Sequence, residues 1–241
     1  MRTKDFLRGR RRHELSAEEL AVLEAAVDSV EVVPARKVLA HRGERLRRST
    51  LIVEGYACRY MDARDGYRQM LSYHVPGDFV DLHSYPTRYI DHAVATISQV
   101  TVAYVRHDRL DGIMSERPHL ASLLWFSTLL DAALHREWIF RIGRLDAAGR
   151  VAHFVCETYC RMRAVGRAAE GRCDLPLTQQ DLGDIVGLTS VHVNRVLRRL
   201  REEGLAIIGR GTLQILNIDQ LARLGEFKAD YLYLEDGPWR E

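Results

Sequence analysis

The sequence predicts an α+β protein in which a β-jelly-roll, one long helix and a C-terminal helical domain follow one another. Three observations support this fold class. Short β-branched and aromatic runs alternate with turn signals between residues 30 and 105; a helical pattern runs unbroken from Pro118 to about Ile142; and two amphipathic helices precede a hairpin pattern near the C-terminus. The length of 241 residues has room for two domains. We expect an N-terminal helix and barrel, a long helix with a hinge, and a C-terminal domain, with the boundaries 1–117, 118–145 and 146–241.

Composition places the chain among folded proteins but does not identify a partner. Hydrophobic residues make up 46% and charged residues 28% of the sequence. No apolar run reaches the roughly 20 residues that span a bilayer, so we expect a cytoplasmic protein without a membrane partner. The four cysteines lack regular spacing, as is typical of free thiols in a reducing compartment: Cys58, Cys156, Cys160 and Cys173. A net charge of +2 is too small to indicate nucleic-acid binding by itself.

The N-terminal part combines one helix with a barrel. Ser16 and Glu19 form a capping box that opens the helix. Turn signals such as Glu54-Gly55 and Pro76-Gly77-Asp78 then separate runs with the character of short strands. These runs are Val30–Val33, Thr50–Val53, Ala57–Met61, Arg68–Tyr73, Phe79–Leu82, Ala93–Ile97 and Val100–Val105. Many short strands at near-regular spacing favour a small barrel or jelly roll.

The long helix has two apolar stripes. We expect the first stripe to form a dimer interface: Leu123, Leu130, Leu134 and Trp138. The second comprises Trp125, Phe126, Leu129 and Ala133. One stripe would cover the barrel and the other an identical helix, although a fully buried helix in a monomer fits the same pattern.

The remaining C-terminal segments are expected to be helical or irregular. A helix is predicted from Ala147 to about Arg163, followed by a loop to Arg172 that is rich in glycine, alanine and charge. The tail after Asn217 has apolar residues at helical spacing, and residues 237–241 are expected to fray.

The segment from Leu177 to Leu205 carries the functional signal. Thr178 and Asp181 mark a helix start, Gly187 ends that helix, and Ser190 is expected to cap the next one. Valines and leucines fall on one face of the second helix: Val193, Val196, Leu197 and Leu200. The small Gly183 permits a close crossing, so the pattern predicts a helix-turn-helix.

The opposite face of the second helix has the chemistry of a DNA-reading surface. Arg195 offers two parallel donors that match guanine, and polar side chains lie near the helix N-terminus, which contacts base edges in such motifs. Arg198 and Arg199 are expected at phosphates. Arg210 lies at the tip of a hairpin formed by 205–208 and 212–216, which is a wing. The complete predicted DNA-binding set is Thr178, Gln179, Thr189, Ser190, Val191, His192, Asn194, Arg195, Arg198, Arg199 and Arg210.

This order of barrel, long helix and winged helix-turn-helix resembles the Crp/Fnr superfamily of bacterial transcription regulators over roughly residues 15 to 217. The most specific match is TQQDLGDIVGLTSVHVNRVLRRL, beginning at Thr178. The resemblance implies a cyclic-nucleotide-binding-like sensor barrel, a homodimer held by the long helix, an inverted-repeat site in double-stranded DNA, and RNA polymerase as a partner. It identifies no cofactor and no catalytic residue.

Two departures from the family pattern limit what the resemblance implies. Members that bind cyclic AMP hold its phosphate with a Gly-Glu pair and an Arg-Ser or Arg-Thr pair, where this sequence has Asp81-Leu82 and Asp91-His92. A carboxylate repels a phosphate, so we expect no response to cyclic AMP. The candidate effector pocket consists of Asp81, His83, Asp91 and His92. Val191 replaces a glutamate found in many relatives, so their site sequence does not transfer.

Several alternatives to this reading stay open at this point. His83 lies near the position of a haem histidine in the carbon-monoxide-sensing member, so a haem-based gas sensor is one alternative. A cupin-like metalloenzyme is another, although the histidines and carboxylates lack the His-x-His spacing of such sites, and we assign no metal ligands. An iron–sulfur cluster is disfavoured, because the family's cluster-binding members use several cysteines, most of them near the N-terminus. The first cysteine of this sequence is Cys58. A regulator that binds DNA without any effector is a third class.

Overall fold

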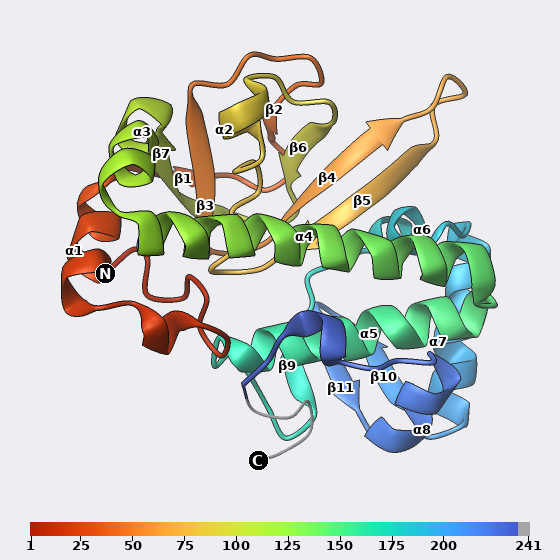
Figure 1. Cartoon of the computed structure of the whole chain (residues 1–241). Helices are drawn as coiled ribbons and strands as arrows, with labels where there is room; N and C mark the ends of the chain where they lie inside the picture. Colours follow the sequence, from red (N-terminus) through yellow and green to blue (C-terminus); the bar gives the residue numbers. More distant parts are fainter. Residues whose placement is uncertain (236–241) are drawn as a thin grey trace. The chain divides into compact units, whose positions relative to one another are not determined.

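Figure 1 shows the computed structural model of the chain, which describes residues 1–235. The expectation that 237–241 fray lies outside the described residues. The chain divides into two compact units, and the division falls within the long helix α4 (Pro118–Arg144). The first unit comprises Met1–Met61 and Ser72–Ala132, and the second Asp62–Leu71 and Ala133–Glu241.

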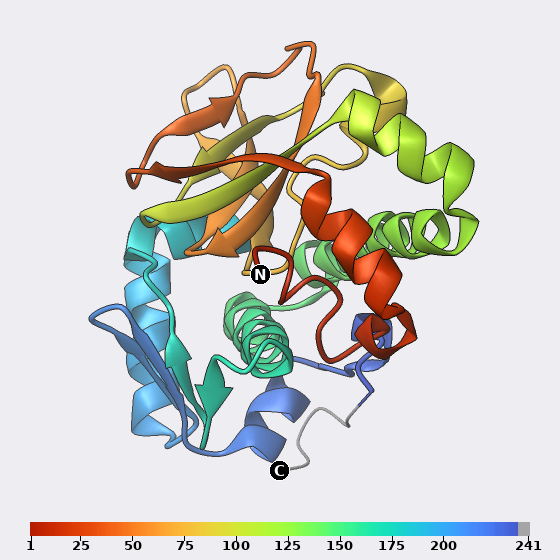
Figure 2. The ribbon, with the colours of Figure 1, turned by 90° about the vertical axis from the view of Figure 1, so that its left-hand side faces the viewer.

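The N-terminal part of the chain contains two antiparallel sheets, which form the expected jelly-roll (Figure 2). One sheet has the order β1-β7-β3 and the other β2-β6-β4-β5. The strands are β1 (Val27–Val33), β2 (Val38–Ala40), β3 (Arg48–Glu54), β4 (Ala57–Asp62), β5 (Arg68–His74), β6 (Ala93–Thr96) and β7 (Val100–Arg106).

Strand β7 lies at the centre of its sheet and pairs with a strand on each side. Ala103 pairs with Val30 of β1 on one side and with Leu51 of β3 on the other. Val102 and Ala103 are fully buried. Strand β7 is therefore covered on both of its faces.

Helices close one end of this core. The helices of the first unit are η1 (Arg12–Glu14), α1 (Ala17–Ala25), α2 (Ser84–Thr87) and α3 (His107–Glu116). The predicted capping box of α1 is present, with Ser16 accepting from the Glu19 backbone and Glu19 accepting in return. Leu110, Leu120 and Leu123 from α3 and α4 are fully buried in the same apolar cluster as Leu23 of α1.

The second unit contains a helical layer and a small sheet. Its helices are α5 (Ala147–Ala164), α6 (Gln179–Val186), α7 (Ser190–Glu202), α8 (Ile218–Leu224) and η2 (Asp230–Leu232). Its sheet has the order β10-β11-β9-β8, formed by β8 (Ala168–Ala169), β9 (Arg172–Asp174), β10 (Ala206–Gly209) and β11 (Thr212–Ile215). Helix α5 is the centre of this unit, because most of its residues are buried.

Three details differ from the sequence-based expectations. The strand expected at Phe79–Leu82 is a single bridge between Phe79 and Leu51, after which the chain turns. The loop expected up to Arg172 contains β8 and β9, where Leu213 of the wing pairs with Cys173. Strand β2 was not expected, because it has only three residues and lies at a sheet edge.

No helix within residues 1–235 is long and apolar enough to cross a membrane.

Candidate DNA-binding site

Helix α6 begins and ends as its sequence predicts. Thr178 caps it by accepting from the Asp181 backbone, and the Asp181 carboxylate accepts from the Thr178 backbone at 2.8 Å. Gly187 ends the helix in the left-handed conformation with φ of 67°, which favours glycine. The length of α6 is therefore fixed by local chemistry at both ends.

The turn into α7 depends on Gly183. A Cβ atom added at Gly183 would lie 2.5 Å from the Leu188 carbonyl oxygen, far inside van der Waals contact. The Leu188 N–H donates to the Gly183 carbonyl at 3.0 Å. Only glycine therefore permits this close approach between α6 and the turn.

Thr189, not Ser190, caps α7, which corrects the sequence-based prediction by one residue. The Thr189 side chain accepts from the His192 backbone, and Ser190 is the first helical residue. The Ser190 hydroxyl instead donates to Gln180 Oε1 at 2.9 Å. Both residues carry a hydroxyl, so the sequence alone does not distinguish which one precedes the helix.

The apolar face of α7 packs inward as predicted. Val193 and Leu200 are fully buried, and Val196 and Leu197 are less than 10% exposed. The predicted DNA-binding residues lie on the remaining surface. All of them are exposed except Ser190, which is half-buried.

Arg195 is a cation on the exposed face of α7. Within the part of the chain that the structure describes, its guanidinium makes no hydrogen bond or ion pair. The neighbouring Asn194 donates to Gln179 Oε1 at 3.2 Å, which links α7 to the start of α6. Arg195 is thus presented beside an ordered amide pair, with all its donors available for a ligand.

The two later arginines have carboxylate partners on the same helix. Arg199 Nε lies 2.8 Å from Glu203 Oε1, and Arg198 Nε lies 4.0 Å from Glu202 Oε1. These pairs are exposed, so they are weak and a phosphate can compete with them. The two glutamates nevertheless offset part of the positive charge of Arg198 and Arg199 in the unbound protein.

The wing has the predicted tight turn. Arg210 and Gly211 both have positive φ, at 53° and 79°, between the paired residues Gly209 and Thr212. This pattern is typical of a two-residue hairpin turn that matches the twist of its strands. The exposed Arg210 side chain therefore lies at the tip.

The C-terminal unit matches a known family. Residues 149–224 match the model of the Crp-like helix-turn-helix domain. The chain is 29% identical to the transcriptional activator protein FnrL of Cereibacter sphaeroides over 89% of this chain and 86% of that protein. It is 26% identical to FixK2 from Bradyrhizobium japonicum, whose solved structure superposes with a TM-score of 0.74 and covers 81% of this chain and 96% of that one. The chain is therefore similar to Crp/Fnr regulators along most of its length.

Other relatives of this Crp/Fnr regulator agree. The nitrogen fixation regulation protein FixK of Bradyrhizobium diazoefficiens is 26% identical over 69% of each chain. A CRP-family regulator from Thermus thermophilus, 14% identical, shares the fold with a TM-score of 0.66 and covers 82% of this chain and 97% of that one. The protein is a DNA-binding transcriptional regulator of the Crp/Fnr type, with a jelly-roll, a long helix and a helix-turn-helix.

The stripe predicted as the dimer interface is covered within this single chain. Leu123, Leu130 and Trp138 are buried, and Leu134 is half-buried. Trp138 donates from Nε1 to Glu157 Oε1 at 3.2 Å, inside the second unit. Three of the four side chains are therefore packed within the chain, whereas the sequence-based expectation placed all four at a dimer interface.

The opposite face of α4 is exposed and apolar. Trp125 is 66% and Ile139 73% exposed, and Leu129 and Phe140 are also largely accessible. At 100° per residue all four lie on one side of the helix. Trp125 and Leu129 belong to the second stripe of the sequence, and Ile139 and Phe140 extend it.

The four residues of the candidate effector pocket do not act as one group. Asp81 is buried and accepts from the Thr50 backbone at 2.5 Å and from the Thr50 hydroxyl at 2.8 Å. Burial raises its pKa to about 6, against these two hydrogen bonds, which lower it. Asp81 therefore anchors the loop that precedes α2 onto strand β3.

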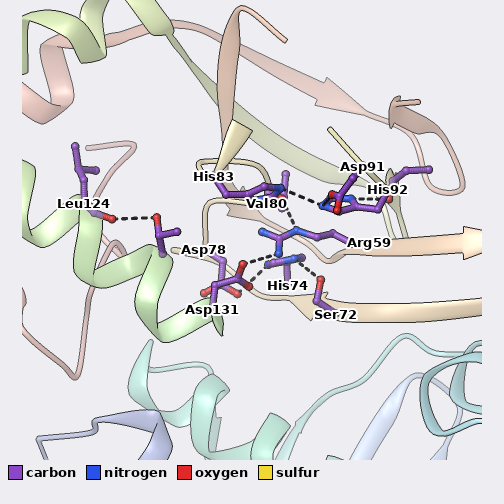
Figure 3. Close-up of polar contacts among 12 residues, drawn as sticks. Arg59, Ser72, His74, Asp78, Val80, His83, Asp91, His92, Leu124 and Asp131 are labelled. Carbon is purple, nitrogen blue, oxygen red and sulfur yellow. Dashed lines mark hydrogen bonds and ion pairs between the residues drawn. The ribbon is translucent and has the colours of Figure 1, made fainter. Parts of the chain in front are cut away.

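The other three residues converge on one another. His83, Asp91 and His92 have side-chain ligand atoms that all lie within 4.8 Å (Figure 3). His83 and His92 are nine positions apart in sequence, and the left-handed Arg88, with φ of 64°, turns the chain between them. No spacing motif signals this cluster, which is why the sequence did not assign it as a set of ligands.

Arg59 connects this region to α4. Its Nε donates to the Val80 carbonyl at 2.6 Å, and its Nη1 lies 2.5 Å from Asp131 Oδ2 (Figure 3). His74 lies on the same side and contacts Ser72 at 2.7 Å. Sequence analysis did not select Arg59, His74 or Asp131, because a single charged residue in a strand or helix has no motif.

The comparisons favour neither the haem sensor nor the cupin-like metalloenzyme. The geometry excludes a haem held between these two histidines, because His83 Nε2 faces His92 Nε2 at 3.2 Å and leaves no room for a macrocycle.

Proposed function

We propose that this Crp/Fnr regulator acts as a homodimer that binds an inverted repeat in double-stranded DNA and recruits or blocks RNA polymerase there. The observation that carries the proposal is the free Arg195 guanidinium on the exposed face of α7, beside the ordered amides of Asn194 and Gln179. An arginine held in this way suits a bidentate contact with guanine in the major groove. Arg198, Arg199 and Arg210 would contact phosphates.

Dimerisation through the exposed stripe of α4 is the second part of the proposal. Trp125, Leu129, Ile139 and Phe140 together expose an apolar face that is unusual for a helix in water. A second copy of the same helix would cover it by a self-complementary contact, as a two-fold symmetric dimer requires. The two recognition helices would then read half-sites about one turn of DNA apart.

We further propose that the protein works in the cytoplasm and has no catalytic activity. Four buried cysteines without regular spacing suit a reducing compartment: Cys58, Cys156, Cys160 and Cys173. The family consists of transcription regulators.

Selection of bound duplexes from a random pool tests the proposal directly. We expect the recovered sequences to contain an inverted repeat with a guanine in each half-site. The proposal is overturned if purified protein, with and without cell extract, prefers no duplex over bulk competitor at moderate salt. Recovery of a motif without two-fold symmetry would overturn the dimer while preserving DNA recognition.

A further inference from the structure

The cluster near the start of β6 has the composition of a metal site. His83 precedes the short helix α2, whereas Asp91 and His92 precede β6, so two separate segments contribute (Figure 3). His83 Nε2 and His92 Nε2 are 3.2 Å apart, and Asp91 Oδ1 lies 3.8 Å from His92 Nε2. Two imidazoles and one carboxylate form a common ligand set for first-row transition metals.

The separation of the two imidazole nitrogens fits a shared ion. Two nitrogens bound to one tetrahedral Zn²⁺ at ~2.0–2.1 Å lie roughly 3.3 Å apart. The observed separation of 3.2 Å is close to this value. The Asp91 side chain is 82% exposed, so it can rotate toward the two nitrogens without disturbing the core.

The immediate surroundings orient His92 as a ligand. His92 Nδ1 lies 3.4 Å from the Ala93 carbonyl oxygen. Since a carbonyl only accepts, the proton belongs on Nδ1, and the lone pair of Nε2 faces the cluster. A backbone carbonyl on the second ring nitrogen is the usual support of a metal-bound histidine.

A hydrogen bond between two histidines is the simpler explanation of the 3.2 Å contact. It accounts for two residues but gives no role to Asp91, whose carboxylate is the third ligand in reach. Arg59 would oppose a cation, but Asp131 compensates its charge at 2.5 Å. The convergence of three potential ligands from two segments therefore favours an ion.

We propose that His83, Asp91 and His92 bind one divalent transition-metal ion, Zn²⁺ or Fe²⁺, in the sensor unit. Three protein ligands leave coordination positions open, so the ion would also offer a place for water or a small ligand. This inference does not depend on DNA binding.

Titration of the metal-free, untagged chain tests the site. Co²⁺ serves as the spectroscopic probe, and Zn²⁺ and anaerobic Fe²⁺ are then added to compete for it. We expect one Co²⁺ per chain with visible d–d absorption, displaced by Zn²⁺ or Fe²⁺. We expect His92→Ala and Asp91→Ala each to weaken the affinity by at least about tenfold, since changes even outside the ligand sphere cost 10–100-fold.

Two controls make the outcome decisive. Asp91→Ala alters an exposed side chain, so it is expected to leave the thermal unfolding of the apoprotein unchanged. Its metal affinity therefore tests the site even if the His92→Ala variant does not fold. His41→Ala removes an exposed histidine of the same unit and is expected to bind Co²⁺ as wild type. Substoichiometric binding by wild type, or equal affinity of the Asp91→Ala and His41→Ala variants, would overturn the proposal.

Discussion

Arg59 Nη1 and Asp131 Oδ2 lie 2.5 Å apart and form an ion pair between strand β4 and helix α4. The side chains are 3% and 19% exposed, so the pair is largely removed from water. The same arginine lies beside His74 and donates to the Val80 carbonyl. The pair therefore ties the long helix to the interior of the sensor unit.

Asp131→Ala is expected to destabilise the protein by about 3 kcal/mol, because it leaves the buried Arg59 charge without its carboxylate. Chemical denaturation at neutral pH measures the loss. The double variant Arg59→Met with Asp131→Leu removes both charges and should recover most of it. If the single variant costs less than about 1 kcal/mol, the pair is not a buried interaction in solution.

The stability of the protein should fall as the pH falls from about 6.5 to 4. Burial and Arg59 lower the pKa of His74 to about 4, against the nearby Asp78 and Asp131 carboxylates. The folded state keeps His74 neutral while the unfolded chain binds a proton, so its contribution is complete above pH 6.5 and lost toward pH 4. The total loss from this residue is about 3 kcal/mol.

The variant His74→Gln isolates that contribution. Glutamine can still contact Ser72 but does not titrate, so the slope of unfolding free energy against pH should decrease by up to about 1.4 kcal/mol per pH unit. Asp81, whose pKa is raised, contributes in the opposite direction but equally in both proteins. Identical slopes would show that His74 titrates alike in the folded and the unfolded chain.

Arg195→Ala should weaken specific DNA binding by about 1–3 kcal/mol and flatten the preference at one base pair of each half-site. The reason is loss of a bidentate contact, and quantitative binding to the selected site and its single-base variants measures it. An equal loss on specific and random duplexes would contradict a reading role.

Arg199→Ala should instead weaken all duplexes alike, by less than about 1 kcal/mol, because Glu203 already offsets its charge. The matched variant Glu203→Gln should strengthen binding to every duplex. A change in base preference for either variant would assign Arg199 a contact with a base.

Trp125→Glu should raise the dimer dissociation constant substantially, since an exposed tryptophan at an interface centre contributes at least about 2 kcal/mol. Sedimentation equilibrium measures the shift from dimer to monomer. Tyr67→Glu provides the control, because Tyr67 is 68% exposed but lies on the turn between β4 and β5. Unchanged association of Trp125→Glu would place the interface elsewhere.

Cyclic AMP should not bind with micromolar affinity, because Asp91 stands where the cyclic-AMP-binding members have an arginine for the phosphate. Isothermal titration calorimetry tests this, and Asp91→Arg should not lower affinity for the nucleotide. Saturable heat at micromolar concentration with wild type would contradict the prediction.

Local patterns in the sequence predicted most of the fold and the exposed face of the helix-turn-helix. The face of α7 follows from 3.6-residue periodicity, and the boundaries of α6 from a capping box and Gly187, so neither depends on distant contacts. The short β8 and β9 have too few residues for a period. They form through pairing, because β9 pairs with strand β11 of the wing and β8 pairs with β9.

The orientation of the two α4 stripes could not be predicted from the sequence, and neither could the cluster of His83, Asp91 and His92. Both stripes are apolar, and only packing decides that Leu123 turns inward while Trp125 faces solvent. The cluster depends on the turn at Arg88, a residue type that does not predict positive φ. In both cases tertiary contacts, rather than local propensity, determine which side chains meet.

The close approach at Gly183 separates the parts of the helix-turn-helix that can vary from those that cannot. The Leu188 carbonyl occupies the space that any side chain at 183 would need, whereas Val191, Asn194 and Arg195 point outward and support nothing in the core. Descendants of this protein can thus acquire new target promoters by exchanging a few outward side chains, while the underlying scaffold is inherited unaltered.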